Sequence, residues 1–252
     1  MMITAQVMYK EVAYQADLSR CIDLSIPLGK VRCFFAPHLS IQAYQNGDFI
    51  GSVKEGAAVN FFDVHLNPHG NGTHTECMGH ISAEQYSLNT HLTCFHFVAK
   101  LISLTPLQKE IGGDRVISPE IFPNTLEEQL PEALIIRTIP NDQQKLSRDY
   151  SGTNPAYLTV EAVDMLVKRG VKHLVLDLPS IDKETDGGVL AGHKRFWNYP
   201  HTDRLDCTIT ELAFIPDEAE DGLYLLNIQT IPLELDASPS RLLIYRLVEA
   251  HV

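Results

Sequence analysis

One short segment of the chain concentrates side chains that can bind a metal ion and transfer protons. Residues 67–80, Asn-Pro-His-Gly-Asn-Gly-Thr-His-Thr-Glu-Cys-Met-Gly-His, contain three histidines, a glutamate and a cysteine. Imidazole nitrogens and carboxylate oxygens are common ligands of divalent metals, and imidazole exchanges protons near neutral pH. The segment is therefore predicted to carry one part of a metal-dependent active site, and the rest of the chain to position it.

The spacing of His74, Glu76 and His80 indicates which side chains act together. His74 and Glu76 are two residues apart, so an extended backbone would place both side chains on the same face. His80 follows four residues after Glu76, and Gly72 would allow the backbone to approach the site closely. Each histidine alone is compatible with a surface loop, so the prediction depends on the whole cluster.

The composition excludes several other functions. The 252 residues include 20 Lys and Arg against 32 Asp and Glu, a formal net charge of -12. A chain this acidic gains nothing from counterion release at a polyanion, so no nucleic-acid partner is expected. No apolar run approaches the ~18 residues of a membrane span, so no membrane partner is expected. The five cysteines are scattered without a CxxC pair, which favours a reducing, cytoplasmic location.

The clearest regular unit lies in the second half of the chain. Thr159 is a good N-cap, residues 160–167 carry apolar side chains at helical spacing, and Gly170 ends the predicted helix. Residues 171–178 follow as a predicted strand. Another strand is expected at 57–66, and the pattern of few helices among many strands favours an α/β or α+β fold.

Two other segments carry weaker signals. Residues 117–130 contain Pro119 after Ser118, which is typical of a helix start. Residues 32–56 contain turn signals and are expected to be irregular, as a long loop that covers a site often is.

The segment around His74 resembles the signature H-x-G-T-H-x-D-x-P-x-H of the metal-dependent cyclase/formamidase family. The best-known members are bacterial kynurenine formamidase and isatin hydrolase. Gly72, Thr73, His74 and His80 match this pattern at its spacing.

Three positions depart from the signature. Gly70 stands where the family has its first histidine, Glu76 where it has aspartate, and Met78 where it has proline. His69 precedes the missing histidine by one residue, so it is either the displaced first ligand or an ordinary loop histidine.

The resemblance extends from about Ile22 to about Phe214. It includes an opening strand at 22–27, and a helix, a strand and a D-x-P-S-x-D turn between residues 158 and 182. It implies an α/β fold with a swivelling β/β/α arrangement, mixed sheets and few helices. It also implies one cyclase/formamidase-like domain over residues 1–252, assembled as a homodimer or higher homo-oligomer.

Carried over by position, the resemblance assigns the site residues. His80 would be the catalytic proton-transfer residue. The ligands of a divalent metal, zinc or manganese, would be His69, His74, Glu76, His193 and Glu211. The implied function is hydrolysis of a small amide, formamide or cyclic amide by metal-activated water, as in an arylformamidase.

Alternatives remain at this point. The departures from the signature are compatible with a non-catalytic protein of the cyclase fold that binds a small ligand or a protein partner. Asn71 could offer an amide oxygen to the metal. Cys77 could bind the metal, although packing or lining the substrate site is favoured. Phe34 could line an aromatic pocket or pack in the core. Asp182 is expected to make turn hydrogen bonds.

Overall fold

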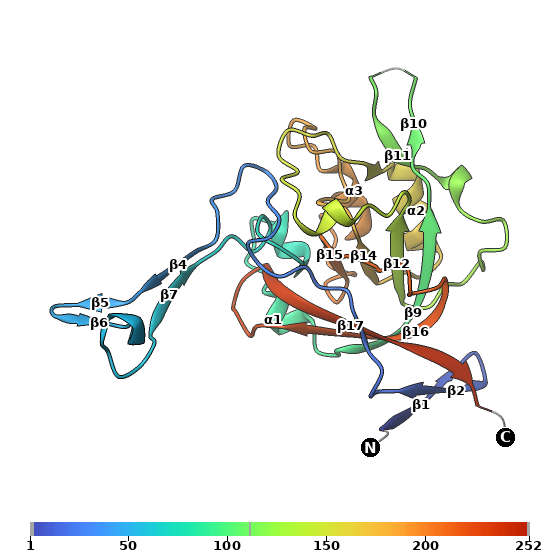
Figure 1. Cartoon of the computed structure of the whole chain (residues 1–252). Coiled ribbons are helices and arrows are strands. Elements are labelled where there is room, and N and C mark those ends of the chain that lie inside the picture. The colour runs from blue at the N-terminus through green and yellow to red at the C-terminus, as the bar shows by residue number, and fades with distance from the viewer. Residues whose placement is uncertain (1–2, 111, 251–252) are drawn as a thin grey trace.

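Seven strands close into a barrel within the described part of the chain, residues 3–110 and 112–250 of a computed structural model (Figure 1). Neighbouring strands run parallel from β9 to β15, and the other pairs are antiparallel. β8 pairs with β15 and also with β17, which closes the ring. In barrel order the strands are β17 (Ala237–Glu249), β16 (Gly222–Thr230), β9 (His96–Leu104), β12 (Ala133–Thr138), β14 (His173–Leu176), β15 (Thr208–Glu211) and β8 (His74–Glu76).

The parallel strands are buried on both faces. Every residue of β12 and β14 is buried, and both strands are rich in the aliphatic residues that parallel sheets favour. Leu134 and Ile136 of β12 belong to one apolar cluster, whereas Ala133 and Ile135 belong to another. Because side chains alternate between the faces of a strand, the second cluster fills the barrel and the first lies between the barrel and its helices.

α2 (Val160–Lys168) and α3 (Ala191–Phe196) contribute to the outer cluster. α2 begins where the Thr159 hydroxyl accepts a hydrogen bond of 3.3 Å from the amide of Ala162. It is followed by Gly170, whose φ of 90° favours glycine. The helix and strand predicted over residues 160–178 are confirmed, the strand as β14. α1 (Leu88–His91) packs Leu88 into the barrel cluster.

The prediction of a helix that starts at Ser118 is wrong. Residues 119–121 form a single 3₁₀ turn, and no α-helix is described between residues 117 and 130. Pro119 suits a first turn, but Pro123 lacks the amide that the next turn would need.

The remaining strands lie outside the barrel. β1 (Thr4–Tyr9) and β2 (Val12–Asp17) form a hairpin, and β2 pairs with β17. β3 (Ile22–Asp23) also pairs with β17. A small separate sheet consists of β10 (Leu107–Gln108), β11 (Arg115–Ile117) and β13 (Tyr157–Leu158). The predicted α/β class with mixed sheets and few helices is confirmed. Within the described residues, every helix is too short or too polar to cross a membrane.

Residues 40–65 form an arm that projects far from the barrel (Figure 1). β4 (Ser40–Ala43) pairs with β7 (Phe62–His65) along its stem, and β5 (Gln45–Asn46) pairs with β6 (Phe49–Ile50) near its tip. β7 is the strand predicted over residues 57–66. The segment expected to be irregular supplies the other strands of the arm, so it is more ordered than its composition indicated.

Candidate metal centre

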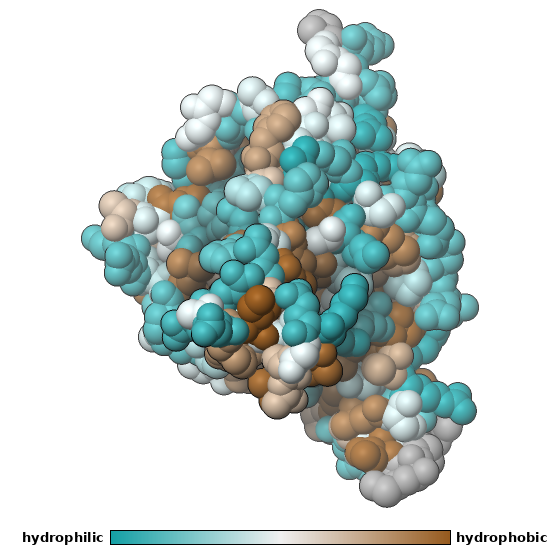
Figure 2. All heavy atoms as spheres, turned by 60° about the vertical axis from the view of Figure 1, so that its left-hand side comes forward, coloured by the Kyte–Doolittle hydropathy of each residue, from teal (hydrophilic) through white to brown (hydrophobic). Residues whose placement is uncertain are grey.

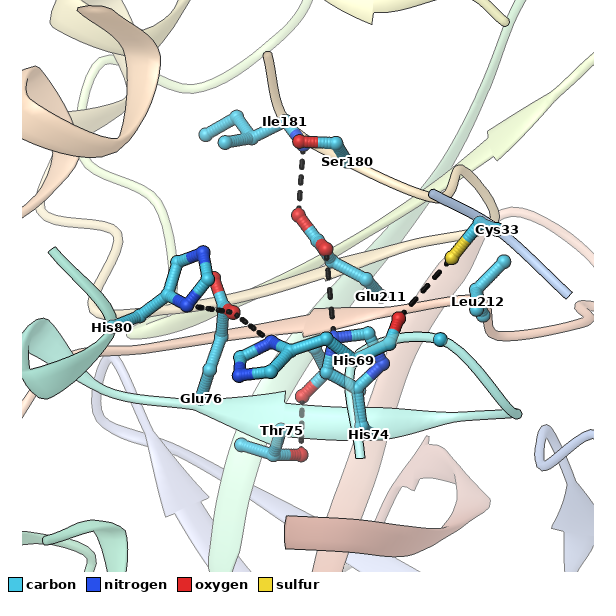
Figure 3. A network of polar contacts seen from close by, with 12 residues as sticks. Cys33, His69, His74, Thr75, Glu76, His80, Ser180, Ile181, Glu211 and Leu212 are labelled. Carbon is cyan, nitrogen blue, oxygen red and sulfur yellow. Dashed lines mark hydrogen bonds and ion pairs between the residues drawn. The ribbon is translucent and has the colours of Figure 1, made fainter. Parts of the chain in front are cut away.

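The strand that closes the barrel brings three distant segments of the chain together. His74 and Glu76 both lie on β8, where Glu211 of β15 is paired with His74 and Ala237 of β17 with Glu76. Residues two apart, and residues directly opposite on neighbouring strands, share a face of the sheet. Figure 3 shows the side chains of His74, Glu76 and Glu211 gathered on that face.

His74 is fully buried, and one of its ring nitrogens is held by the backbone. Nδ1 lies 3.1 Å from the carbonyl oxygen of Gly72 and donates to it. Nε2 lies 3.6 Å from Oε2 of Glu211 and has no hydrogen-bond partner among the described residues. Burial and the nearby His69 lower the pKa of His74 to about 4. Its Nε2 therefore carries a free lone pair at neutral pH.

Glu76 lies at the middle of the cluster. Its Oε1 is 3.1 Å from Nε2 of His193, and its Oε2 is 3.1 Å from Nδ1 of His69 and 3.8 Å from Nδ1 of His80. Neither contact of Oε2 has the alignment of a hydrogen bond, so this buried oxygen is unbonded within the described residues. Burial opposes ionisation, but the surrounding histidines outweigh it and hold the pKa of Glu76 well below its usual value.

His193 comes from the short helix α3 and is anchored by Asp182. Oδ2 of Asp182 lies 2.6 Å from Nδ1 of His193 and also accepts from the backbone amide of His193. Burial alone would lower the pKa of His193, but Asp182 and Glu76 raise it to about 10. Nε2 of His193 is left facing Glu76 and Glu211, at 3.1 and 3.9 Å.

Glu211 accepts a hydrogen bond of 2.8 Å from the amide of Ile181 through Oε1. Burial and the neighbouring Glu76 carboxylate raise the pKa of Glu211 well above its usual value. Two carboxylates in one buried site repel each other, which is why the pKa of Glu211 is raised beside the ionised Glu76.

His69 approaches the same carboxylate from a loop, and His80 from the 3₁₀ turn η2 (Met78–His80). His69 Nε2 lies 2.9 Å from Oδ2 of Asp236, and the same oxygen lies 3.5 Å from Nδ1 of His80. Burial alone would lower the pKa of His69, but its hydrogen bond to Asp236 and the nearby carboxylate of Glu76 raise it to about 10. Asp236 precedes β17 directly, so the strand pairing that closes the barrel places it here.

The missing first histidine of the signature has a steric explanation. A Cβ atom at Gly70 would lie 2.3 Å from the Cβ of Ala36 and 3.3 Å from the carbonyl oxygen of Cys33. Contact at 2.3 Å is far inside van der Waals separation, so a histidine at position 70 does not fit this backbone. The ring of His69 instead reaches Glu76.

The arrangement fits a divalent cation. Nitrogen and oxygen ligand atoms lie within 4.8 Å of one another in three overlapping groups among the described residues. These are His69 with His74 and Glu76, Glu76 with His80 and His193, and His69 with His80 and Asp236. Two buried ligand atoms, His74 Nε2 and Glu76 Oε2, lack a hydrogen-bond partner among the described residues. Such atoms are costly to bury unless something binds them. Neutral imidazole and carboxylate are the ligand types that divalent metals accept.

The structure brings together all six predicted site residues, His69, His74, Glu76, His80, His193 and Glu211. Their roles remain predictions. Asp236 was missed, because no local pattern links it to residues 67–80. Asp182 was expected only to make turn hydrogen bonds, but it also holds His193. The signal for Asp182 was its place at the end of the D-x-P-S-x-D turn, which does not by itself indicate a contact with His193.

Two alternative ligands are occupied elsewhere. The Asn71 side chain accepts from the amide of Asn67 at 2.8 Å and donates to the carbonyl of Pro37 at 2.9 Å, so it shapes the loop. The buried Sγ of Cys77 lies 3.4 Å from the carbonyl oxygen of Tyr86, which is a packing role.

A cavity of about 360 Å³ opens beside the cluster. Its inner wall includes His69, His80, His193 and Glu211, and its other residues include Phe34, Leu190 and Lys183. A volume of this size suits a small molecule. Phe34 therefore lines the cavity, which was one of the two roles expected for it.

Comparison with known proteins places this geometry in context. The model of the Cyclase family ("Putative cyclase") matches residues 22–183, more than half of the chain. A curated relative, kynurenine formamidase from Bordetella petrii, is 26% identical over 205 residues, which cover 78% of this chain and 85% of the relative.

Solved structures of two isatin hydrolases share the fold. Isatin hydrolase A from Labrenzia aggregata aligns with a TM-score of 0.63 and 14% identity, covering 92% of this chain and 94% of that one. Isatin hydrolase A from Ralstonia solanacearum aligns with a TM-score of 0.63 and 16% identity, covering 91% and 92%.

Proposed function

Because this chain belongs to the Cyclase family, we propose that it is a metal-dependent hydrolase of a small amide, formamide or cyclic amide. The observation that carries the proposal is the pair of buried, unbonded ligand atoms, His74 Nε2 and Glu76 Oε2. A divalent cation would satisfy both. Similarity to a kynurenine formamidase and to the fold of isatin hydrolases supports the choice of reaction.

The proposed metal ligands are His69, His74, Glu76, His193 and Glu211. They offer only nitrogen and oxygen atoms, so zinc and manganese both suit the set. When bound, a divalent cation supplies Lewis-acid chemistry, since it polarises a carbonyl oxygen and increases the acidity of water. The chain itself fixes the ligands before binding, through strand pairing for His74, Glu76 and Glu211.

His80 is the proposed proton donor. It lines the cavity, and its Nδ1 faces the carboxylates of Glu76 and Asp236, which leaves Nε2 for a substrate. In hydrolysis, water adds its oxygen to the carbonyl carbon and the carbon–nitrogen bond breaks. The leaving nitrogen takes a proton from Nε2 of His80, which is general acid catalysis, and the proton that the water gives up restores His80.

The charges around the cavity disfavour an anionic substrate. The lysine in its wall, Lys183, has its Nζ 2.9 Å from Oδ2 of Asp114 and is neutralised by it. Glu184 and Asp186 also line the cavity, and both carboxylates accept only backbone amides. A substrate carboxylate would meet these two acids without a free lysine or arginine in the lining. We therefore expect neutral amides to react with a higher kcat/KM than analogues that carry a carboxylate.

Metal analysis and a substrate panel test the proposal. The purified protein is expected to bind a divalent metal and to hydrolyse at least one neutral N-formyl aromatic amine or cyclic amide. His74→Ala should lose both properties, whereas His65→Ala, a matched change on the arm, should keep them. A protein that binds no metal and hydrolyses nothing in the panel would instead support the non-catalytic alternative, a protein of this fold that binds a small ligand or partner.

We further propose that residues 1–252 form one domain and that the protein is a homodimer or higher homo-oligomer. The arm supports assembly because its stem has one apolar face. Ile41 is paired with Val64, and Ala43 with Phe62, while Gln42 and Asp63 lie on the opposite face. Ile41, Phe62 and Val64 are all exposed, and Figure 2, in which the arm comes forward, shows apolar side chains among polar ones. A lone two-stranded ribbon is marginal in water, so a second copy is proposed to cover this face.

The molar mass in solution tests the assembly. Replacing Phe62 and Val64 together by serine should shift the protein toward the 28.2 kDa of one chain in light scattering. Asp63→Ser, on the polar face of the same strand, should leave the mass unchanged. A wild-type protein that already measures as a single chain contradicts the proposed assembly.

A cytoplasmic location is proposed on separate grounds. All five cysteines are unpaired thiols, and three of them are buried. Five reactive thiols in the unfolded protein, counted with a thiol reagent after isolation without reductant, are expected. A disulfide found in that material would argue for an oxidising compartment.

A further inference from the structure

Two of the site's histidines share one arrangement of their ring nitrogens. His74 directs Nε2 toward Glu211, while its Nδ1 is held by the Gly72 carbonyl. His193 directs Nε2 toward Glu76, while its Nδ1 is held by Asp182. Histidines that bind metal commonly have the second nitrogen hydrogen-bonded in this way, since the bond fixes the tautomer and the ring orientation.

His69 has the same arrangement with the nitrogens exchanged. Its Nδ1 lies 3.1 Å from Oε2 of Glu76, and its Nε2 lies 2.9 Å from Oδ2 of Asp236. Asp236 therefore binds the ring nitrogen of His69 that faces away from Glu76, as Asp182 does for His193.

Among the described residues, Asp236 makes the only hydrogen bond to the His69 side chain, whose ring otherwise lies against the rings of His74 and His80. His69 lies in a loop, outside any strand or helix, and its side chain is partly exposed. Without a partner for Nε2, several orientations of the ring would be open to it. Asp236, by contrast, is fixed by its backbone, because its carbonyl accepts a hydrogen bond of 3.0 Å from the amide of Cys77, next to Glu76. The carboxylate is therefore a fixed reference for the ring.

We propose that Asp236 is a positioning residue that aims Nδ1 of His69 at the metal, and so restores the ligand that Gly70 cannot supply. The inference rests on the proposed function, since it assumes a metal beside Glu76. It goes beyond it by assigning a role to a residue outside the signature segment. It also explains how the signature can lose its first histidine without losing a ligand. The backbone at position 70 excludes a side chain. The adjacent His69 is oriented instead by Asp236, which directly precedes β17.

A double-mutant cycle on metal affinity tests the inference. The full-length protein, stripped with a chelator, is titrated with Co²⁺ alone, and affinity and the visible absorption spectrum of the bound ion are recorded. Asp236→Ala should weaken Co²⁺ binding by about 10–100-fold, the usual cost of losing an outer partner of a ligand histidine. Asp236→Asn should weaken it less, because an amide oxygen still accepts a bond from Nε2.

The role of Asp236 must vanish when His69 is absent. In a His69→Ala background, Asp236→Ala should cause no further loss of affinity, and the Co²⁺ spectra of His69→Ala and the double variant should coincide. Glu234→Gln, an exposed carboxylate two residues away in the same segment, should behave as wild type in both measurements.

The outcomes separate this inference from the function beneath it. A loss caused by Asp236→Ala that persists without His69 would show that Asp236 binds the metal itself, which overturns the positioning role alone. Unchanged affinity in Asp236→Ala overturns it as well. If the wild-type protein binds no Co²⁺, the proposed function fails and the inference with it. Should Asp236→Ala not fold, the Asp236→Asn and His69→Ala pair completes the same cycle.

Discussion

The candidate centre has two halves that the protein builds in different ways. His74, Glu76 and Glu211 lie on paired barrel strands and are almost fully buried, with at most 4% of each side chain exposed. His69, His80 and Asp236 lie outside the barrel strands, in loops or a 3₁₀ turn, and 24–29% of each side chain is exposed. The strand half is fixed by a hydrogen-bonded ladder, whereas the loop half depends on contacts between side chains.

The difference explains how the two halves tolerate sequence change. In the strand half, the departure from the signature is a change of length only, since Glu76 keeps a carboxylate where the family has aspartate. In the loop half, the proposed ligand itself has moved from position 70 to His69. A ladder sets which face each residue occupies, so a shift of one position would turn the ligand away. A loop carries no such constraint and can substitute one neighbour for another.

The largest effect is expected in the strand half. Glu76→Gln keeps the side-chain volume but removes the charge at the middle of the cluster. We expect metal affinity to fall by more than the ~100-fold upper cost of losing an outer partner, and hydrolysis to become undetectable. Equilibrium dialysis against the metal, followed by a rate assay, measures both. Glu132→Gln, an exposed glutamate, is the control. Retention of metal by Glu76→Gln would remove the distinction between the halves.

A smaller and more selective effect is expected in the loop half. His80→Asn should lower kcat by about 10²–10⁴-fold, the usual contribution of a general acid, while metal affinity changes only a few-fold. Steady-state kinetics on the metal-loaded variant, with metal content determined on the same sample, separate the two quantities. If metal affinity and kcat fell together, His80 would instead be a metal ligand, and the proposed difference between the two halves would not hold for it.

A buried histidine away from the centre tests how much of the strand half's behaviour comes from burial alone. His173 of β14 is buried, its Nδ1 lies 2.9 Å from the Thr208 hydroxyl, and burial lowers its pKa to about 4. Below pH 6.5 the unfolded chain binds a proton that the folded chain refuses, so stability falls as the pH falls. Between pH 7.5 and pH 4 this contribution should reach about 3 kcal/mol.

Urea unfolding across that pH range measures this effect. The free energy of unfolding of His173→Gln should depend less steeply on pH than that of the wild type, by about that amount. Parallel curves for the two proteins would mean that His173 is not held neutral by burial.

Local patterns in the sequence predict the strand half better than the loop half. The two-residue spacing of His74 and Glu76 implies a shared face once the segment is extended, and β8 is extended. The capped helix α2 and the strand β14 follow from an N-cap, an apolar stripe and a glycine. These signals all act within about ten residues, where backbone geometry alone relates one side chain to another.

Asp236 and the arm could not be predicted in this way. Asp236 reaches the centre only because β17 pairs with β8, two segments about 160 residues apart. Neither segment contains a sequence pattern that predicts this pairing. The strand β7 of the arm was predicted, but residues 32–56 were expected to be irregular because their glycine and asparagine signal turns. The alternation of Ile41 and Gln42 against Val64 and Asp63 forms a ribbon only once the two stretches meet. Long-range pairing decides both features.

The seam where β8 joins β15 and β17 has a consequence for the endurance of the whole barrel. A cation bound there would link the segments that contain residues 69, 193 and 211. It would therefore stabilise the closed barrel. By mass action, a ligand at 1,000 times its dissociation constant adds about 4 kcal/mol to the stability of the state that binds it. Removing the metal with a chelator should therefore lower the melting temperature as well as the rate of hydrolysis. The same cation would then have both a catalytic and a structural role.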